Sequence, residues 1–174
     1  FMSIAEQMGF VLEKTAQSIT IKERLDFSCA IFDRDGELIA NAPHMPVHLG
    51  SMDSTVKSII KNNSTLSPGD LFAINAPYNG GTHLPDITIV NPIWNSKKSE
   101  IIFFTAARGH HTDIGGLTPG SMPCNSTDIH EEGIYIDNWK IVDNGVFKED
   151  EIKNKLLSGS HPARSPLTLS LIHI

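Results

Sequence analysis

Apolar residues recur with two different periods along this chain, and the two periods predict where its helices and strands lie. Near the start they follow the three- to four-residue spacing of a helical face, at Ile4, Met8, Val11, Leu12, Ala16 and Ile19. Ser3 also stands three residues before Glu6, which is the spacing of a capping box. The pattern therefore predicts a helix over residues 3–18.

Shorter apolar segments bounded by turn residues are typical of strands. They cover residues 27–32, 37–40, 71–75, 87–92 and 101–107, and residues 134–142 are also expected to be extended. The turn at residues 33–36 joins the first two strands in a hairpin, and helices are predicted over residues 51–62 and 149–157. Because the strands come in hairpin-like pairs, we predict an α+β fold with a mixed, largely antiparallel sheet, a few flanking helices and long glycine-rich loops.

Composition narrows the classes of protein and of partner. The 174 residues suffice for one domain with a core, which we place at residues 3–166. A net charge of -6 argues against nucleic acid as a partner. No apolar run approaches the roughly 18 residues of a membrane span.

The two cysteines, Cys29 and Cys124, fit a reducing compartment, so we expect a cytoplasmic protein. Both ends look cut, and residues 167–174 form a doubtful apolar tail in what we expect to be a fragment.

The first candidate site lies in a glycine-rich segment, residues 80–86, where His83 precedes Asp86 by three positions. Pro85 between them excludes a helix interior or a central strand, and it restricts Leu84 to extended conformations. Such a rigid unit can present an imidazole and a carboxylate to one divalent metal ion. In the alternative interpretation, Asp86 caps a turn and His83 lies at the surface.

The second candidate site begins where the strand at residues 101–107 ends, with His110, His111 and Asp113. Adjacent residues of an extended chain point to opposite faces. Only one of the two histidines is therefore expected to join His83 and Asp86, while the other orients a ligand or contacts substrate. Two imidazoles and one carboxylate leave coordination positions open, which suits catalytic Zn, Mn or Fe. Alternatively, both histidines are solvated and Asp113 forms an Asx turn.

Four further residues are candidates for contact with a substrate or for acid–base chemistry. Asp26 and His48 are candidate pocket residues, although Pro46 argues against a helical pair of His48 with His44. Arg108 can hold an anionic group of a substrate or pair with a carboxylate. Glu131 can act as a base or ligand, or it can belong to a solvated turn.

Nucleotide-binding and serine-hydrolase motifs are absent from the sequence. It contains no Gly-x-x-x-x-Gly-Lys-Ser/Thr phosphate loop, no dinucleotide fingerprint and no Gly-x-Ser-x-Gly elbow. If the reaction uses ATP, the nucleotide must therefore bind elsewhere.

Six segments, in order along the chain, carry a resemblance to a known family. They are Ile21–Ser28, His44–Met52, Gly80–Asp86, Gly109–Gly116, Pro119–Met122 and Glu131–Gly133. Over residues 3–166 the chain resembles the hydantoinase B/5-oxoprolinase family. The B region of that family is several hundred residues long, so the resemblance implies the N-terminal part of a B subunit or B region.

The resemblance implies an ATP-dependent opening of a cyclic amide, such as 5-oxoproline or a hydantoin. An actin-like A-type partner subunit would bind ATP and Mg and phosphorylate the substrate, which agrees with the missing phosphate loop. The implied metal ligands are His83, Asp86 and one of His110 and His111. With the candidates above, the expected catalytic residues are His111, Glu131 and Asp113, and the expected substrate-binding residues are Arg108, His48 and Asp26.

One departure from the family pattern leaves other functions open. The family commonly has Asn-Asp-Pro-Tyr where this chain has Asn-Ala-Pro-Tyr, with Ala76 in place of the acid. One alternative is the large subunit of an acetone- or acetophenone-type carboxylase. The other is a non-catalytic scaffold subunit whose glycine loops form a partner interface.

Overall fold

A single antiparallel sheet organises the chain. The structure, a computed structural model, describes residues 1–42 and 44–166, so the predicted tail at residues 167–174 lies outside the described residues. Within the described part, seven strands pair in the order β2-β1-β5-β4-β3-β6-β7, and each pairing is antiparallel. The strands are β1 Phe27–Phe32, β2 Leu38–Asn41, β3 Leu71–Ile74, β4 Asp86–Trp94, β5 Ile101–His110, β6 Trp139–Asp143 and β7 Val146–Phe147. The predicted α+β class with a largely antiparallel sheet is confirmed.

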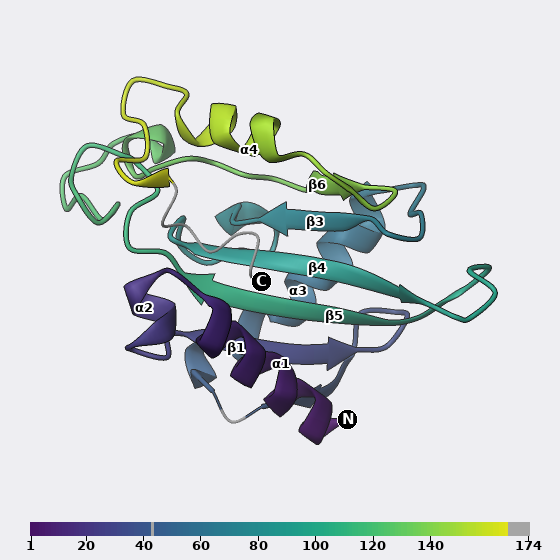
Figure 1. The fold of residues 1–174 in the computed structure, drawn as a ribbon. Coiled ribbons are helices and arrows are strands. Elements are labelled where there is room, and N and C mark those ends of the chain that lie inside the picture. The colour runs from purple at the N-terminus through teal and green to yellow at the C-terminus, as the bar shows by residue number, and fades with distance from the viewer. Residues whose placement is uncertain (43, 167–174) are drawn as a thin grey trace.

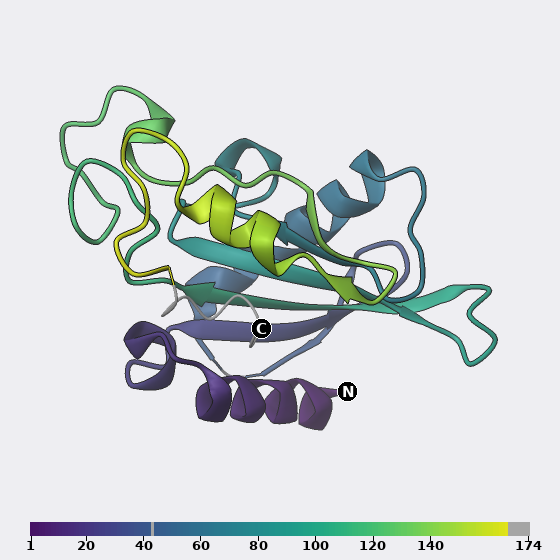
Figure 2. The same cartoon turned by 45° about the horizontal axis from the view of Figure 1, so that its top comes forward.

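Helices cover both faces of this sheet (Figures 1 and 2). The helices are α1 Met2–Thr15, α2 Ile19–Lys22, α3 Pro46–Asn62 and α4 Glu149–Leu156, with short 3-10 turns η1 Pro77–Asn79 and η2 Ile129–Glu131. Helix α3 packs Met52, Val56 and Ile59 on one face of the sheet. Helices α1 and α4 pack on the other face, through Leu12 and Ile152 respectively. Within the described ranges, no helix is both long enough and apolar enough to cross a membrane.

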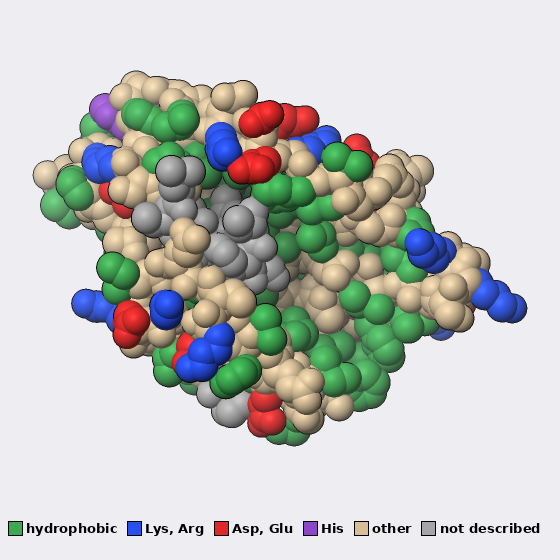
Figure 3. Space-filling view, viewed as in Figure 1, with side chains coloured by type: hydrophobic (Ala, Val, Ile, Leu, Met, Phe, Trp, Pro, Cys, Tyr) green, Lys and Arg blue, Asp and Glu red, His purple; other side chains and the backbone are tan. Residues whose placement is uncertain are grey.

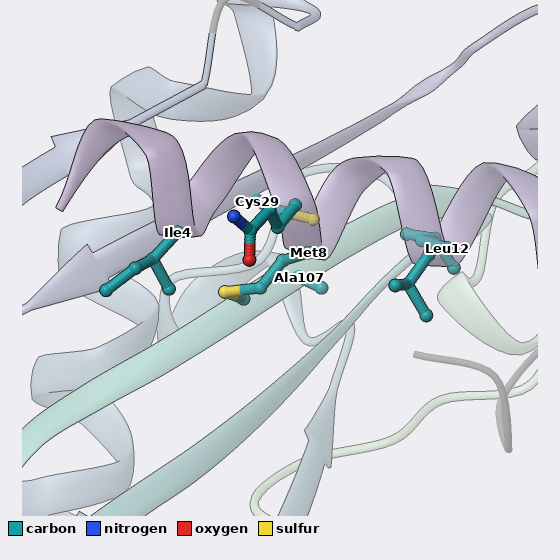
Figure 4. A pocket seen from close by; sticks show the side chains of 7 residues that line it. Ile4, Met8, Leu12, Cys29 and Ala107 are labelled. Atoms are coloured by element: carbon teal, nitrogen blue, oxygen red, sulfur yellow. The ribbon is translucent and has the colours of Figure 1, made fainter.

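The α1 side of the sheet is hollowed and apolar. A hollow of about 340 Å³ lies between α1 and the sheet, lined by Ile4, Gln7, Met8, Val11, Leu12, Cys29 and Ala107. Figure 4 shows Ile4, Met8 and Leu12 of the helix facing Cys29 and Ala107 of the strands. Hydrophobic side chains also gather beside α1 on the surface of this face (Figure 3). Cys29 is a free cysteine, buried on this side of the sheet, where it packs like a small apolar residue.

Two helix boundaries differ from the prediction for local reasons. The predicted helix at residues 3–18 is interrupted, because Ala16 adopts an extended conformation with ψ 143° and a second helix starts at Ile19. Its N-cap is Phe1, with no side-chain cap, so the capping box predicted at Ser3 does not form. Helix α3 begins at Pro46 rather than at residue 51. Proline fits the first turn of a helix, where its missing N–H is not needed.

The pairing of β4 with β5 positions the candidate site. Their register sets Asp86 opposite His110 and Thr88 opposite Arg108. Directly opposed residues of an antiparallel pair project from the same face of the sheet. The side chains of Asp86 and His110, at the start of β4 and the end of β5, therefore meet at one end of the sheet on the α3 face.

Candidate metal centre

Three residues from the two predicted segments form a compact cluster. Nδ1 of His110 lies 3.0 Å from Oδ1 of Asp86, and Nδ1 of His83 lies 3.2 Å from Oδ2 of the same carboxylate. One candidate ligand atom from each of the three residues can be chosen so that all lie within 4.8 Å of one another. Within the described residues, no other group of three or more His, Cys, Asp or Glu side chains brings its ligand atoms as close to one another. The arrangement can hold a divalent metal ion.

A tight, internally bonded turn presents His83 and Asp86. The backbone N–H of Asp86 donates to the carbonyl of His83 at 3.0 Å, and the hydroxyl of Thr82 donates to Oδ2 of Asp86 at 3.0 Å. The buried side chain of Asn75 donates to the carbonyl of Leu84 at 2.8 Å. A Cβ atom at Gly81 would lie 2.4 Å from the carbonyl oxygen of Asn75, so this close approach requires glycine.

The cluster stabilises its carboxylate in the ionised form. Burial by itself raises the pKa of Asp86, but bonds with His110 and His83 outweigh that effect and hold the pKa well below its usual range. The bond to Asp86 in turn raises the pKa of His83, against the effect of burial. Asp86 is only 4% exposed while His83 is 41% exposed, so the cluster opens to solvent on the His83 side.

Asp26 and His48, both predicted to bind substrate, lie beside this cluster. Nε2 of His48 is 3.4 Å from Oδ1 of Asp26 and 3.4 Å from Oδ2 of Asp86. The His48 side chain is buried, whereas that of Asp26 is 28% exposed. Burial lowers the pKa of His48 although both carboxylates act in the opposite direction. Of the two residues, Asp26 is the one whose carboxylate reaches solvent.

Arg108 does not occupy the substrate-facing position predicted for it, because its guanidinium is fully buried and bonded within the protein. It donates to Oγ1 of Thr88 at 2.7 Å, Oγ of Ser51 at 2.5 Å, Oγ1 of Thr55 at 2.8 Å, and the carbonyls of His48 at 3.3 Å and Gly80 at 3.2 Å. All five partners are hydroxyl or carbonyl oxygens, so Arg108 does not form the ion pair with a carboxylate that was the alternative prediction. Burial lowers the pKa of Arg108 to about 10. Arg108, on β5, thus connects β4 and β5 to α3 and to the loop that contains Gly80.

His111 lies outside the cluster, although it was predicted as a ligand and as a catalytic residue. Its side chain is fully buried, and neither ring nitrogen has a hydrogen-bond partner within the described residues. Burial lowers its pKa to about 4. His110 alone of the adjacent pair meets Asp86, as the alternation of an extended chain predicts.

Asp113 and Glu131, the other predicted catalytic residues, use their carboxylates to shape the loop after β5. Asp113 accepts from the backbone of Gly115 at 2.9 Å, which is the Asx turn of the alternative interpretation, and from Arg164 at 2.8 Å. Burial opposes the ionisation of Asp113, but these bonds lower its pKa overall. Glu131 completes the capping box of η2 with Asp128. Both carboxylates therefore have structural partners outside the cluster.

Several residues that support the site were not identified from the sequence. Thr82 and Asn75 hold the His83 turn, and Thr88, Ser51 and Thr55 receive the bonds of Arg108. Asn75 offered a signal, since it is a polar residue that directly follows the apolar segment of residues 71–74. Ala76, where the family commonly has an acid, is fully buried in the apolar cluster under α3.

Comparisons with known proteins agree with these motifs. Residues 1–168 match the family described as Hydantoinase B/oxoprolinase. The chain is 54% identical over 153 residues to 5-oxoprolinase 1 of Arabidopsis thaliana, which aligns 87% of this chain with 12% of the plant protein. The chain therefore spans only 12% of the length of that relative.

Two solved structures share the fold. The ATP-dependent caprolactamase from Pseudomonas jessenii matches with a TM-score of 0.77 and 30% identity, over 88% of this chain and 26% of that chain. A nucleotide-free acetone carboxylase matches with a TM-score of 0.80 over 89% of this chain and 21% of that chain, but its 21% identity shows likeness of fold alone. Because the family match extends over almost all of its length, this chain belongs to the hydantoinase B/oxoprolinase family.

Proposed function

We propose that this chain is part of the B subunit, or B region, of an ATP-dependent hydantoinase/5-oxoprolinase that opens a cyclic amide by hydrolysis. The observation that carries the proposal is the His83–Asp86–His110 cluster, whose ligand atoms lie within 4.8 Å of one another. Relatives named 5-oxoprolinase and caprolactamase support the substrate class. 5-Oxoproline, hydantoin and caprolactam all contain an amide within a ring.

The donor atoms of the cluster fit a divalent metal such as Mn, Zn or Fe. Neutral imidazoles and an ionised carboxylate are the ligand types these ions accept, and Asp86 is held in its ionised form. Both cysteines lie elsewhere, Cys29 under α1 and Cys124 exposed, which argues against a closed structural zinc site. When bound, a divalent cation supplies Lewis-acid polarisation of a carbonyl and lowers the pKa of a bound water.

We assign contact with the substrate and the attacking water to Asp26. It is the partly exposed carboxylate beside the cluster, whereas the carboxylates of Asp113 and Glu131 have structural partners and His111 is fully buried. As the water oxygen bonds to the amide carbonyl carbon, one water proton passes to Asp26. When the ring C–N bond then breaks, that proton passes to the departing nitrogen. If the partner has phosphorylated the carbonyl oxygen, this leaves an acyl phosphate, which a second water hydrolyses to the carboxylate and free phosphate.

The nucleotide belongs to a partner in this proposal. The sequence has no phosphate loop, so ATP and Mg would be bound by a hydantoinase A-type subunit or region that activates the amide. A cytoplasmic location remains part of the proposal and rests on the two cysteines being free. The acetone carboxylase likeness, at 21% identity, gives no separate support to carboxylation of a ketone.

The test uses the protein that contains this chain together with its A-type partner. We expect bound divalent metal by elemental analysis, and ATP hydrolysis that depends on 5-oxoproline or hydantoin. His83→Ala should abolish both, while the same change at the exposed His161 should leave both intact. Absence of metal, or turnover of a ketone that depends on bicarbonate with none of a cyclic amide, would refute the proposal.

A further inference from the structure

His48 is fixed at the edge of the metal centre by contacts that its backbone makes. It is the third residue of α3, whose N-cap is Met45 and which begins at Pro46. The carbonyl of Met45 accepts from the hydroxyl of Ser28 at 2.9 Å, and the carbonyl of His48 accepts from Arg108 at 3.3 Å. The first turn of α3 is thereby tied to β1 and β5, so the ring of His48 projects from a rigid support.

The ring of His48 is directed at two carboxylates. Its Nε2 atom lies 3.4 Å from Asp86 and 3.4 Å from Asp26. Its Nδ1 atom is buried and has no hydrogen-bond partner within the described residues. Since a carboxylate accepts hydrogen bonds and does not donate them when ionised, the proton of a neutral His48 ring belongs on Nε2.

Metal binding would change which groups donate to Asp86. In the structure, Asp86 is contacted by His110, His83, Thr82 and His48. A histidine nitrogen that binds a cation does so through its lone pair and no longer donates a hydrogen bond. Once His83 and His110 bind the ion through the Nδ1 atoms that face Asp86, two contacts to this carboxylate remain within the described residues: the hydrogen bond from Thr82 at 3.0 Å and the approach of His48 Nε2 at 3.4 Å.

We propose that His48 is a positioning residue that holds the Asp86 carboxylate in place for the metal ion, rather than a ligand or a substrate contact. It is not one of the three residues whose ligand atoms converge within 4.8 Å, and its buried ring faces the carboxylates. Residues that contact a metal ligand without binding the metal themselves typically change the metal affinity by about 10- to 100-fold when they are mutated. The inference rests on the metal centre of the proposed function, but not on the reaction.

A matched pair of polar substitutions tests the proposal without any assay of activity. In His48→Gln, the side-chain amide reaches the position of Nε2, whereas in His48→Asn it reaches only the position of Nδ1. We expect His48→Gln to bind Co²⁺ within about threefold of the unchanged chain, with the same visible absorption spectrum. His48→Asn should lose roughly 10- to 100-fold in affinity and show an altered spectrum. His161→Gln, a change at an exposed histidine, is the control.

Each other outcome overturns the proposal in a recognisable way. Equal, severe losses in both variants, with folding intact by circular dichroism, would identify His48 as a ligand. Unchanged affinity and spectrum in both variants would show that His48 has no positioning role. If the unchanged chain binds no Co²⁺, the metal centre itself fails, and the inference fails with it.

Discussion

Asp86 and His110 stand directly opposite each other on β4 and β5, and their side chains meet at 3.0 Å between Oδ1 and Nδ1. The two residues are distant along the chain, but one belongs to the central strand β4 and the other to its neighbour β5. The carboxylate and one imidazole of the candidate metal centre are therefore fixed by strand register. His83 is held separately, by a turn that is bonded to the same carboxylate.

The adjacent histidines should respond oppositely to substitution. His110→Leu should abolish stoichiometric Co²⁺ binding, because it removes an imidazole from the cluster. His111→Leu should preserve binding and unfold no more readily than the unchanged chain, since it replaces a buried ring without hydrogen-bond partners in the described residues. Co²⁺ titration and thermal unfolding measure the two effects. Loss of Co²⁺ binding in a folded His111→Leu variant would contradict this assignment.

Replacement of Arg108 should cost far more stability than replacement of an exposed arginine. Arg108→Met leaves the oxygens of Thr88, Ser51 and Thr55 without their donor, so we expect a loss of about 3 kcal/mol or more in the free energy of unfolding. Arg34→Met removes only an exposed ion pair with Glu100, which is worth roughly 0–1 kcal/mol. Urea unfolding of both variants makes the comparison. Similar losses in the two would show that Arg108 is not the internal tie described above.

Two glycine substitutions should change stability in opposite directions. Gly81→Ala places a Cβ atom 2.4 Å from the carbonyl oxygen of Asn75, and we expect it to lower stability by about 1–3 kcal/mol and to weaken Co²⁺ binding through the adjacent His83. Gly50→Ala, in α3, meets no atom within 4 Å. It should raise stability by roughly 0.5–1 kcal/mol. A Gly81→Ala variant with unchanged stability and Co²⁺ affinity would contradict the tight packing of this loop.

Asp70 should make the stability of the fold sensitive to acid. Its carboxylate is buried. It accepts from the backbone of Ser67 and Asn144, each at 2.9 Å, and lies 2.9 Å from Nζ of Lys140. Burial by itself would raise the pKa of Asp70, but these bonds outweigh it and lower the pKa below its ordinary value. The stabilisation is thus present above the unfolded-state pKa, about 3.9, and is lost as pH falls through the lower folded-state value.

Asp70→Asn should therefore lower the free energy of unfolding at pH 7 by about 1–3 kcal/mol. The difference from the unchanged chain should shrink as the pH is taken below the ordinary carboxyl pKa. Urea unfolding across a pH series measures this, with Asp35→Asn at the exposed β1–β2 turn as the control. A difference that stays constant into acid would contradict the argument.

The sequence was sufficient where structure depends on neighbouring residues. The β1–β2 hairpin formed around its predicted turn, and Pro85 made the His83–Asp86 unit recognisable because its effect on the backbone is local. The alternation of an extended chain correctly limited the contact with Asp86 to one of His110 and His111. The α+β class followed from hairpin-like spacing.

Features set by distant contacts were not predictable in this way. The burial of Arg108 depends on hydroxyls from α3 and β4 that converge only in the folded chain. The apolar pattern likewise did not show that Pro46 starts α3 and so directs His48 toward Asp86. Asp113 and Glu131 looked catalytic because of their residue type, yet both shape a loop. Residue type indicated the chemistry available, while the partners of each side chain decided which groups are left to perform it: Asp113 is bonded to the distant Arg164, and Glu131 to the nearby Asp128.

The consecutive histidines at the end of β5 have a consequence for how the sheet specifies its own pairing. If β5 slipped by one residue against β4, His111 would stand opposite Asp86, and an imidazole would still face the carboxylate. The candidate metal ligands therefore give little protection against this error. Protection comes from Phe104 and Ala106, which pack under α3 and would turn to the other face of the sheet after such a slip. The apolar residues Phe104 and Ala106 thus fix the strand register on which the opposition of Asp86 and His110 depends.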